Sequence, residues 1–447
     1  MKTSPLKVLV IGTGGREHAL ALSLSRDAGV SEVHAAPGNP GMAQVATLHD
    51  VDPMAGDAVA DLAARLGVDL VVVGPEAPLV AGVADALAAR GIACFGPSRA
   101  AAQLEGSKAF SKEVMAAAGV PTARALTCTT TEQAAAALDE LGAPYVVKDD
   151  ALAAGKGVVV TNDRAEALAH AEACGRVVVE EFLDGPEVSL FAVCDGMSAH
   201  ALQPAQDFKR ILDGGRGPNT GGMGSYSPLP WTQPDLAELV MATVVQPTLD
   251  EMARRGTPYV GCLYVGLALT ADGPRVIEFN CRFGDPDIQP VLALLDSPLG
   301  ELLQAAAEGR LGEVARPAFR DGAAVTVVLA SAGYPASSSK GDVITGVGAA
   351  NGVNDVDVIH AGTAIVDAPE PGDPEHRHLV TAGGRVLAVR ALGYDVDDAR
   401  SRAYAAADLI SFDGMQRRSD IAAEPLGVIE GASVLASTGS TPDRKES

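Results

Sequence analysis

Two lysines and two glycines mark the segment PYVVKDDALAAGKGVVV, residues 144–160. β-Branched residues precede Lys148 and follow Gly157, which predicts a strand on each side of a short loop. Within the loop, Gly155 and Gly157 allow the backbone to approach a ligand closely, and Lys156 adds a second positive charge. Backbone N–H groups beside two ammonium groups suit the phosphates of a nucleoside triphosphate. An ordinary β-turn explains the same pattern without a ligand, so the interpretation depends on residues elsewhere.

The better-known phosphate-binding loops do not fit this chain. A Walker loop requires glycine at position 150 and Ser or Thr at position 157, which are Asp150 and Gly157 here. The N-terminal sequence GTGGRE has Glu17 where a dinucleotide-binding fingerprint has its third glycine. A nucleotide site in this chain must therefore be of another type.

A carboxylate and an amide lie two residues apart in VIEFNCRFGDPD, residues 276–287. Side chains at i and i+2 of a strand share a face, so Glu278 and Asn280 point the same way. Two oxygen donors beside a phosphate loop suit a hard cation such as Mg²⁺ or Mn²⁺. Arg282 lies on the same face and adds a charge for a phosphate or a carboxylate. An E-x-N triplet also arises by chance, so this site too needs its partners.

Residues 7–98 alternate between short apolar strands and helical stretches, which predicts a parallel sheet with helices on its faces. We expect strands at 7–11, 32–36, 69–73 and 92–95, and helices near 15–26, 55–66 and 79–90. Ligands bind such sheets at the carboxyl ends of the strands. Three loops rich in Gly or Pro fall at those ends, GTGGREH at 12–18, PGN at 37–39 and GPEAPL at 74–79. Arg16, at a predicted helix N-terminus, could bind a phosphate there.

The middle of the chain offers further polar groups near predicted strand ends. Glu187 follows a strand at 177–183, where a carboxylate can accept the two hydroxyls of a ribose. Residues 205–230 form the longest predicted loop, which contains Lys209 and a glycine-rich stretch. Loops of this length are uncommon unless they are functional or disordered. Because apolar strands lie on both sides, a binding loop is favoured over a linker. A helix is expected over 235–255.

The C-terminal third is predicted to be a separate α+β unit. Apolar runs at 323–330, 343–344 and 358–366 predict strands, and those at 378–381 and 385–391 predict a hairpin around Gly383-Gly384. A helix is expected at 397–410. We therefore divide the chain into an N-terminal α/β domain (1–98), a central domain (99–318, with a small subdomain at about 121–186), the α+β domain (319–422) and a disordered tail (423–447).

The composition narrows the class of protein. The chain has 447 residues, of which 47% are hydrophobic, enough for roughly three well-cored domains. A formal net charge of −23 disfavours a general role on nucleic acid or on an anionic membrane. None of the six cysteines forms a C-x-x-C pair, which suggests reduced thiols. With no signal peptide and no membrane-spanning stretch, we expect a cytoplasmic protein.

Taken together, these segments resemble the ATP-grasp superfamily and, within it, the phosphoribosylamine–glycine ligase family. The resemblance covers about residues 6–421 and rests on segments in the family's order: VLVIGTGGREHAL, APGNPG, VVGPEAPLVAGV, FGPS, LEGSKAF, VVKDDALAAGKGV, VEEFLDGPEVSL, GPNTGGMGSYSP and VIEFNCRFGDP. It implies an N-terminal doubly wound parallel-sheet domain, a central ATP-grasp fold and a C-terminal β-rich α+β domain. It also implies a ligase of purine biosynthesis that joins glycine to phosphoribosylamine through a glycyl phosphate, with ATP and Mg²⁺ or Mn²⁺, and we expect a monomer.

The resemblance also assigns roles to residues. The expected catalytic groups are Lys148, Lys209 and Arg282, and the expected metal ligands are Glu278 and Asn280. ATP is expected to bind Lys108, Lys148, Gly155, Lys156, Gly157, Glu180, Glu181, Phe182, Leu183 and Glu187. The substrates are expected at Gly14, Gly15, Arg16, Glu17, His18, Gly38, Asn39, Glu76, Pro218, Asn219, Thr220, Gly221, Gly222, Met223 and Arg282.

Some residues depart from the family pattern. Asp149 and Ala151 replace alanine and glycine, Phe208 replaces a frequent histidine, and Asp287 replaces a common glutamate. The resemblance makes residues 151–157 a lid over the ATP phosphates, and Ala151 could bias this lid if the closed state needs a positive φ there. Residues 262–270 have no carboxylate for a second metal ion. The alternatives are another ATP-grasp ligase or carboxylase of purine metabolism, and a non-catalytic nucleotide-binding protein. The segments GGREHA and GPNTGGMG disfavour the first, and both lysines with Glu278 and Asn280 disfavour the second.

Overall fold

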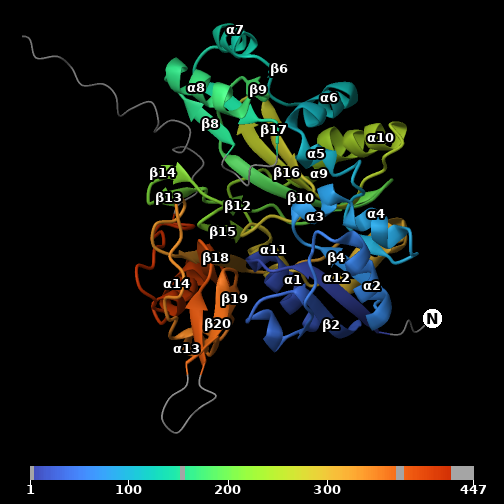
Figure 1. Ribbon diagram of the computed structural model, residues 1–447, viewed down its shortest axis with the longest axis vertical. Helices are drawn as coiled ribbons and strands as arrows, with labels where there is room; N and C mark the ends of the chain where they lie inside the picture. Colours follow the sequence, from blue (N-terminus) through green and yellow to red (C-terminus); the bar gives the residue numbers. More distant parts are fainter. Residues whose placement is uncertain (1–4, 152–156, 369–376, 424–447) are drawn as a thin grey trace, which may run out of the picture.

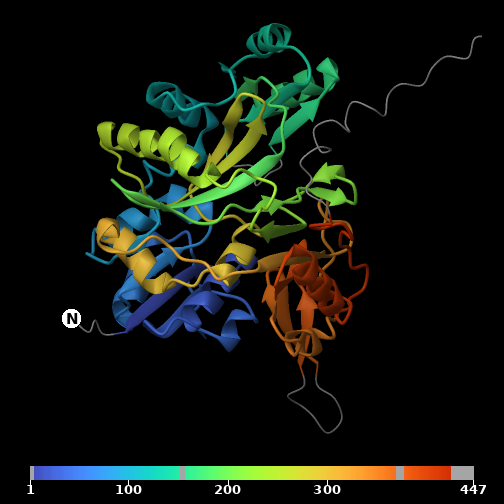
Figure 2. The same cartoon turned by 180° about the vertical axis from the view of Figure 1, so that it is seen from behind.

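The computed structural model describes residues 5–151, 157–368 and 377–423 (Figure 1). The predictions for Gly155, Lys156 and, apart from residue 423, the tail lie outside these residues. Three sheet-containing domains follow one another along the chain, and a small subdomain projects from the central one at one end of the molecule (Figures 1 and 2).

The N-terminal domain is built on a five-stranded parallel sheet, as predicted. Its strand order is β3-β2-β1-β4-β5, and the central strand β1 is apolar and buried over Val8–Ile11 because helices cover both of its faces. Strands β2 and β3 lie on one side of β1, and β4 and β5 lie on the other. Right-handed crossovers therefore place the helices of the two halves on opposite faces of the sheet. The strands are β1 (Leu6–Gly12), β2 (Val30–Pro37), β3 (Thr47–Leu48), β4 (Leu70–Val73) and β5 (Cys94–Phe95).

The helices of this domain differ from the prediction at one place. The helix expected over 79–90 is divided at Gly82, whose φ of +97° ends one helix before the next begins. The predicted strand at 92–95 is reduced to its last two residues. The helices are α1 (Gly15–Ser25), η1 (Met42–Gln44), α2 (Gly56–Leu66), α3 (Glu76–Ala81) and α4 (Val83–Ala88).

The central domain combines two four-stranded antiparallel sheets. The larger has the order β11-β10-β16-β17, from β10 (Glu187–Asp195), β11 (Ala199–Ala201), β16 (Val260–Thr270) and β17 (Gly273–Asn280). The smaller has the order β6-β9-β7-β8, from β6 (Ala125–Cys128), β7 (Tyr145–Asp149), β8 (Val158–Thr161) and β9 (Val177–Glu180). The predicted strands around the lysine loop are therefore present as β7 and β8, which pair antiparallel.

Helices cover these sheets, and the small subdomain has its own core. Its apolar residues, among them Leu138 and Val147, form a cluster separate from the main core. A subdomain with its own core can move as a unit without exposing the main core. The helices are α5 (Gln103–Gly106), α6 (Lys108–Ala118), α7 (Thr131–Leu141), α8 (Arg164–Cys174), α9 (Leu236–Val240), a π-helical turn (Met241–Val245), α10 (Gln246–Arg254), α11 (Ile288–Leu294), α12 (Leu299–Ala307) and the 3₁₀ turn η3 (Leu311–Glu313).

The segment 205–230 is not one long loop, so that prediction is wrong. It contains β12 (Gln206–Asp207), β13 (Arg210–Leu212), β14 (Arg216–Asn219) and β15 (Gly224–Ser227). Strand β15 pairs with β18 (Ala323–Ala330), so this segment completes the C-terminal sheet. Its order is β12-β15-β18-β22-β19, with β19 at Val356–His360 and β22 at Arg385–Gly393. These strands have only two to four residues, and their glycines and proline are typical of turns, so the sequence carries little strand signal.

The predicted hairpin around Gly383-Gly384 is also wrong. Strand β21 (Arg377–Thr381) pairs with β20 (Thr363–Asp367), whereas β22 (Arg385–Gly393) pairs with β18 and with β19 (Val356–His360). The backbones cross here, since a Cβ on Gly362 would lie 2.7 Å from Cα of Gly383. Gly362 and Gly383 therefore serve a close backbone approach and not a reverse turn, and Gly384 leaves space for the Tyr334 ring. Of the expected strand 343–344 only an isolated bridge at Val343 remains, and the helices are α13 (Val347–Asn351) and α14 (Val396–Ala407).

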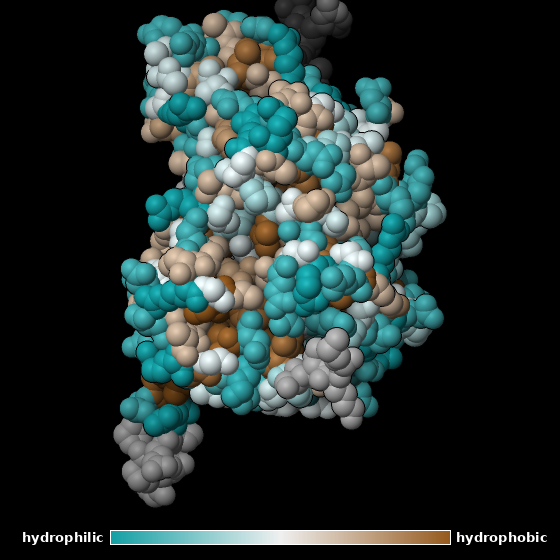
Figure 3. All heavy atoms as spheres, turned by 90° about the vertical axis from the view of Figure 1, so that its right-hand side faces the viewer, coloured by the Kyte–Doolittle hydropathy of each residue, from teal (hydrophilic) through white to brown (hydrophobic). Residues whose placement is uncertain are grey.

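Hydrophilic residues cover much of the face in Figure 3, and hydrophobic residues show between them. No helix in the described ranges is both long and apolar enough to cross a membrane.

Candidate functional site

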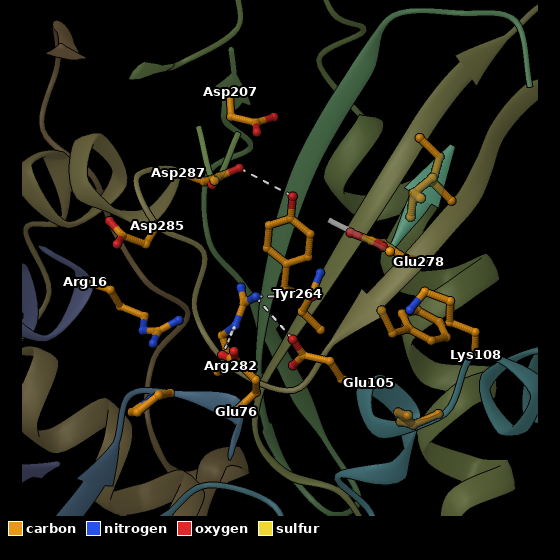
Figure 4. A pocket seen from close by; sticks show the side chains of 18 of the residues that line it. Arg16, Glu76, Glu105, Lys108, Asp207, Tyr264, Glu278, Arg282, Asp285 and Asp287 are labelled. Atoms are coloured by element: carbon orange, nitrogen blue, oxygen red, sulfur yellow. Dashed lines mark hydrogen bonds and ion pairs between the residues drawn. The ribbon is translucent and has the colours of Figure 1, made fainter. Parts of the chain in front are cut away.

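A cavity of about 490 Å³ lies where all three domains meet, and its close-up is Figure 4. The N-terminal domain contributes the loop before α1 and the start of α3, and the central domain contributes β17 and the start of α6. The C-terminal domain contributes Arg385. Predicted site residues that line the cavity are Gly14, Arg16, Glu17, Glu76, Lys108, Gly157, Glu180, Lys209, Thr220, Gly221, Glu278, Asn280 and Arg282.

Arg16 and Glu17 lie in the first turn of α1 and line the cavity, and Glu17 fixes the loop that precedes the helix. The Glu17 carboxylate accepts a 2.6 Å hydrogen bond from the Gly14 N–H and pairs with Arg16, whose Nη1 donates to the Phe283 carbonyl at 3.0 Å. A Cβ on Gly74 would lie 2.1 Å from Oε1 of Glu17, so the glycine leaves space for this carboxylate. The loop is therefore held in one shape by its own charged side chains.

Four predicted substrate residues of this domain, Gly15, His18, Gly38 and Asn39, are not among those that line the cavity. Nδ1 of His18 accepts a 2.7 Å hydrogen bond from the His360 N–H of the C-terminal domain, and burial lowers the pKa of His18 to about 3. Asn39 donates to the carbonyls of Thr13 and His360 and accepts from the N–H groups of Gly41 and Met42. These four bonds use the full capacity of its amide. His18 and Asn39 thus join the N-terminal loops to the C-terminal domain.

Arg282 lies between two carboxylates in the cavity wall. Its Nε is 3.3 Å from Oε2 of Glu76, its Nη2 is 3.2 Å from Oε1 of Glu105, and it also donates to Asn280 Oδ1 at 3.3 Å. Burial would raise the pKa of Glu76, but the guanidinium groups of Arg282 and Arg16 hold it below its ordinary value. Burial keeps the pKa of Glu105 raised in spite of Arg282. Sequence reasoning missed Glu105, although it lies in the LEGSKAF segment.

Glu278 and Asn280 both line the cavity from β17, and so do their neighbours Ile277 and Phe279. No described residue donates a hydrogen bond to Glu278 or forms an ion pair with it, so its carboxylate is available to a ligand. The described residues include no group of three or more His, Cys, Asp or Glu side chains arranged for a metal ion. One carboxylate and one amide oxygen suit Mg²⁺, which keeps several waters and uses substrate phosphates as further ligands.

Lys148 and a lysine that sequence reasoning missed share one buried carboxylate. Nζ of Lys148 is 3.0 Å from Oε2 of Glu180 and donates to the Ile277 carbonyl at 2.9 Å. Lys112 is 3.2 Å from the same Glu180 oxygen. Burial and the charge of Lys148 lower the pKa of Lys112 to about 8, although Glu180 opposes this. Glu180 thus pairs with two ammonium groups. Lys112 and Glu180 line the cavity, whereas the predicted catalytic residue Lys148 is not among the lining residues.

Lys108 lies at the start of α6, next to the lid. Its Nζ donates to the Ala151 carbonyl at 3.3 Å, and the neighbouring Asp150 accepts from the Ala109 N–H at 2.8 Å. Among described residues other than glycine, only Asp355 and Ala422 have a positive φ, so Ala151 has a negative φ in this conformation. Alanine is unstrained there.

Residues 181–183 follow β9 and do not line the cavity. Oε1 of Glu181 accepts from Nη2 of Arg275 and from the Arg124 N–H at 2.9 Å, and Phe182 and Leu183 are partly exposed beside it. Glu187 is paired with Lys209, a contact that sequence reasoning did not anticipate.

The glycine-rich segment is only partly at the cavity. Thr220 and Gly221 line it, whereas Pro218, Asn219, Gly222 and Met223 do not. The Gly221 N–H donates to the Tyr334 hydroxyl at 2.9 Å, and Arg385 donates to the Gly221 carbonyl and pairs with Asp285 at 3.0 Å. Two side chains of the C-terminal domain therefore hold this segment in place.

Three aspartates and a tyrosine that sequence reasoning did not assign to the site also line the cavity, although it had noted Asp287 as a departure from the family pattern. Asp207 lies 3.1 Å from Nζ of Lys209, and Asp287 accepts hydrogen bonds from Ser189 at 2.7 Å and Tyr264 at 3.4 Å. Burial, opposed by Lys209 but helped by Asp287, raises the pKa of Asp207 to about 7. Asp285 is the third aspartate. Strand β16 is buried without alternation from Gly261 to Ala268, so its pattern does not single out Tyr264, and nothing local marks the aspartates as neighbours.

Three family models match the chain in succession. They are those of the phosphoribosylglycinamide synthetase N domain (residues 6–105), ATP-grasp (A) domain (106–288) and C domain (324–424). A curated phosphoribosylamine–glycine ligase from Streptomyces coelicolor is 61% identical over 94% of this chain and all of that protein. One from Mycobacterium leprae is 51% identical over 93% of this chain and 97% of that protein.

Solved structures show the same architecture. A crystal structure of phosphoribosylamine–glycine ligase from Thermotoga maritima matches with a TM-score of 0.78 and 33% identity, over 93% of this chain and all of that one. The biotin carboxylase domain of a Hydrogenobacter thermophilus 2-oxoglutarate carboxylase matches with a TM-score of 0.69 and 17% identity, over 93% and 92% of the two chains, which shows a shared fold. These findings confirm the predicted central ATP-grasp fold, and the chain belongs to the phosphoribosylglycinamide synthetase family.

Proposed function

We propose that this chain joins glycine to 5-phosphoribosylamine at the expense of ATP, giving glycinamide ribonucleotide, ADP and phosphate in de novo purine biosynthesis. The enzyme is a ligase that forms a C–N bond. The curated relatives carry this activity in their names over nearly the whole chain. The observation that carries the proposal is a single cavity in which Arg16 and Glu76 of the first domain face Glu278 and Arg282 of the ATP-grasp domain.

ATP is proposed to lie between the small subdomain and β17. Lys108 and Lys148 would bind its phosphates, and the loop with Gly155, Lys156 and Gly157 would close over them. The backbone of residues 180–183 would hold the adenine, and Glu187 the ribose. Two groups must change partners for this, because Lys148 is now paired with Glu180 and Glu187 with Lys209.

Mg²⁺ or Mn²⁺ is proposed to bind Glu278 and Asn280 together with the ATP phosphates. When bound, the cation supplies positive charge that neutralises the triphosphate. Glu278 is suited to this because no described protein group occupies its carboxylate. Asn280 would release its 3.3 Å hydrogen bond from Arg282, which would remain paired with Glu76 and Glu105.

The reaction needs positioning and charge neutralisation more than a protein nucleophile. A carboxylate is a poor electrophile, so an oxygen of glycine first attacks the γ-phosphorus of ATP and ADP leaves. The neutral amine of phosphoribosylamine then attacks the carbonyl carbon of glycyl phosphate, and phosphate leaves with the glycine oxygen. Lys148, Lys209 and Arg282 are placed to stabilise the charge on these groups. Closure of the small subdomain would keep water from the acyl phosphate.

We also propose that the phosphoribosylamine phosphate and ribose bind Arg16, Glu76 and the segment 218–223, on the first domain's side of the cavity. The chain is proposed to act as a cytoplasmic monomer on small molecules alone. The six free cysteines support a reducing compartment. The functional units proposed are residues 1–98, 99–318 and 319–422.

Oxygen transfer tests this chemistry. With glycine labelled by ¹⁸O in its carboxylate, one labelled oxygen should appear in each phosphate released, because the carbon–oxygen bond of glycyl phosphate breaks. Mass spectrometry of the phosphate measures this. Unlabelled phosphate formed together with glycinamide ribonucleotide would contradict a glycyl phosphate intermediate.

A further inference from the structure

A second cavity, of about 660 Å³, lies apart from the first one, which holds Arg282 and Glu278, and shares no lining residue with it. All three domains line the second cavity. The end of α1 comes from the first domain, α12 from the second, and β19 and β22 from the third (Figure 1). Four arginines are among its lining residues, although the whole chain has a net charge of −23. They are Arg26, Arg310, Arg320 and Arg390.

One carboxylate serves three of these arginines. Asp357 pairs with Arg26 at 2.5 Å and with Arg390 at 2.6 Å, which joins the first and third domains. The side chain of Arg320 forms no hydrogen bond or ion pair with a described residue. Burial lowers the pKa of Arg390, and the charges of Arg26 and Arg320 lower it further while Asp357 opposes them. The three guanidinium groups therefore lie close enough to repel one another.

The other charged groups of the cavity have separate roles or positions. Asp27 accepts hydrogen bonds of 2.8 Å from two backbone N–H groups, one of them in the first turn of α12. Arg310 pairs with two glutamates close to it in the sequence. Asp296 and Glu301 are exposed and form no ion pair with a described residue. Two positive charges thus remain when Asp357 is set against its three arginines.

Arg390 is the member of this group whose environment is incomplete. It is 2% exposed, and its Nη1 donates to the Gln289 carbonyl at 3.1 Å while its Nη2 pairs with Asp357. Its Nε is buried and has no hydrogen-bond partner among the described residues. Leaving such a donor of a charged group unsatisfied is costly, and a buried group of this kind often marks the place of an ion or a water molecule.

We infer that the second cavity binds a phosphate group, as free phosphate or as the monoester of a small organic molecule. A phosphate dianion matches the two charges left on Arg26, Arg320 and Arg390, and planar guanidinium groups suit its oxygens. Arg320 would gain a partner, and the Nε of Arg390 an acceptor. Apolar side chains such as Leu295 and Val314 line other parts of the cavity, which suits the organic part of an ester.

Calorimetric titration of the full chain tests the inference. The probes are inorganic phosphate, AMP and adenosine, and saturating MgADP occupies the proposed ATP site. Phosphate or AMP should bind, and Arg320→Gln should weaken that binding by roughly 10- to 100-fold, the range for losing one hydrogen bond between charged groups. Arg320 is exposed, so this variant should fold. Arg316→Gln is the control, since Arg316 is exposed nearby in the sequence and does not line the cavity.

The same titration distinguishes the two sources of phosphate. Tighter binding of AMP than of phosphate would identify an ester as the ligand, and equal binding would identify the free ion. Adenosine, which lacks the phosphate, should bind at least tenfold more weakly than AMP.

A second measurement does not depend on a variant. Phenylglyoxal modifies accessible arginines, and mass spectrometry of the peptides locates each modified residue. On the unaltered chain with MgADP, the anion that binds should slow the modification of Arg320 and leave that of Arg316 unchanged.

Four results would overturn the inference. Neither anion binds at millimolar concentration, or the unaltered chain and Arg320→Gln bind it equally, which would place it in the first cavity. Adenosine binds as tightly as AMP, which would show that the phosphate is not recognised. Arg320 is modified at the same rate with and without the anion.

Discussion

At the scale of single residues, the charged side chains in and beside the cavity differ in whether another protein group already pairs with them. Arg282, Lys148 and Lys209 each have carboxylate partners in this conformation, whereas Glu278 has none among the described residues. To bind a substrate, each paired cation must replace a protein carboxylate with a substrate oxygen. Its charge then stays paired, which avoids the cost of leaving a buried charge without a partner. Glu278 is instead ready for a cation.

Glu278→Gln should weaken the use of Mg²⁺, because a neutral amide replaces a charged hard ligand. At limiting Mg²⁺ the rate should fall by at least roughly 10²-fold, the scale for losing one charge-stabilising group. Titration of the rate with Mg²⁺ measures this, and thermal unfolding checks the fold. Glu238→Gln, an exposed change on α9, is the control. Full activity of Glu278→Gln at limiting Mg²⁺ would show that the ligand assignment is wrong.

The sequence predicts the position of some of these residues but not of others. Glu278, Asn280 and Arg282 lie close together in one strand and the turn after it, so their spacing alone places them together. Asp207 and Asp287 are separated by 80 positions in the sequence, and they meet only because β10 and β16 pair and present Ser189 and Tyr264 to Asp287. A contact that depends on tertiary packing leaves no local pattern.

At the scale of elements, the strongest predictions concern long apolar strands, and the weakest concern short ones. Strand β1 is a continuous buried run in a parallel sheet, so its composition identifies it. Strands β12 and β15 have two and four residues, and backbone pairing to the C-terminal sheet holds them in place. That pairing attaches the glycine-rich segment, and with it Thr220 and Gly221, to the third domain.

Arg385→Gln tests this attachment. The change removes the charged bonds from the C-terminal domain to the Gly221 carbonyl and to Asp285. The KM for phosphoribosylamine should rise about tenfold, the scale for losing a charged hydrogen bond, while the KM for ATP stays constant. Arg377→Gln, which loses an exposed pair with Asp367, is the control. If the two variants behave alike, the C-terminal domain does not position this segment.

At the scale of the whole molecule, two buried histidines join the first and third domains. His18 accepts from the His360 N–H, and the two rings lie 5.6 Å apart. Burial lowers the pKa of His18 to about 3 and that of His360 to about 4. Both must be neutral in the folded protein, whereas in the unfolded chain they take up protons near pH 6.5.

The free energy of unfolding should therefore fall as the pH falls from about 6.5 toward 4, because the unfolded state binds more protons there. Each histidine should remove about 2 kcal/mol by pH 5, at 1.36 kcal/mol per pH unit. In His360→Gln one titrating group is lost, so the slope of unfolding free energy against pH should be shallower between pH 5 and 6. Urea unfolding at several pH values measures it. Identical slopes would contradict the assignment of His360 as a buried neutral group.

The central claim is that one cavity binds ATP, glycine and phosphoribosylamine together. Its most direct test is ADP release by the purified chain, with phosphoribosylamine generated in place from ribose 5-phosphate and ammonia. We predict that ADP forms at a sustained rate only when glycine, phosphoribosylamine, ATP and Mg²⁺ are all present, and that glycinamide ribonucleotide forms in equal amount. Equal turnover with an unrelated amine or carboxylate would contradict the claim, while leaving the ATP-grasp fold intact.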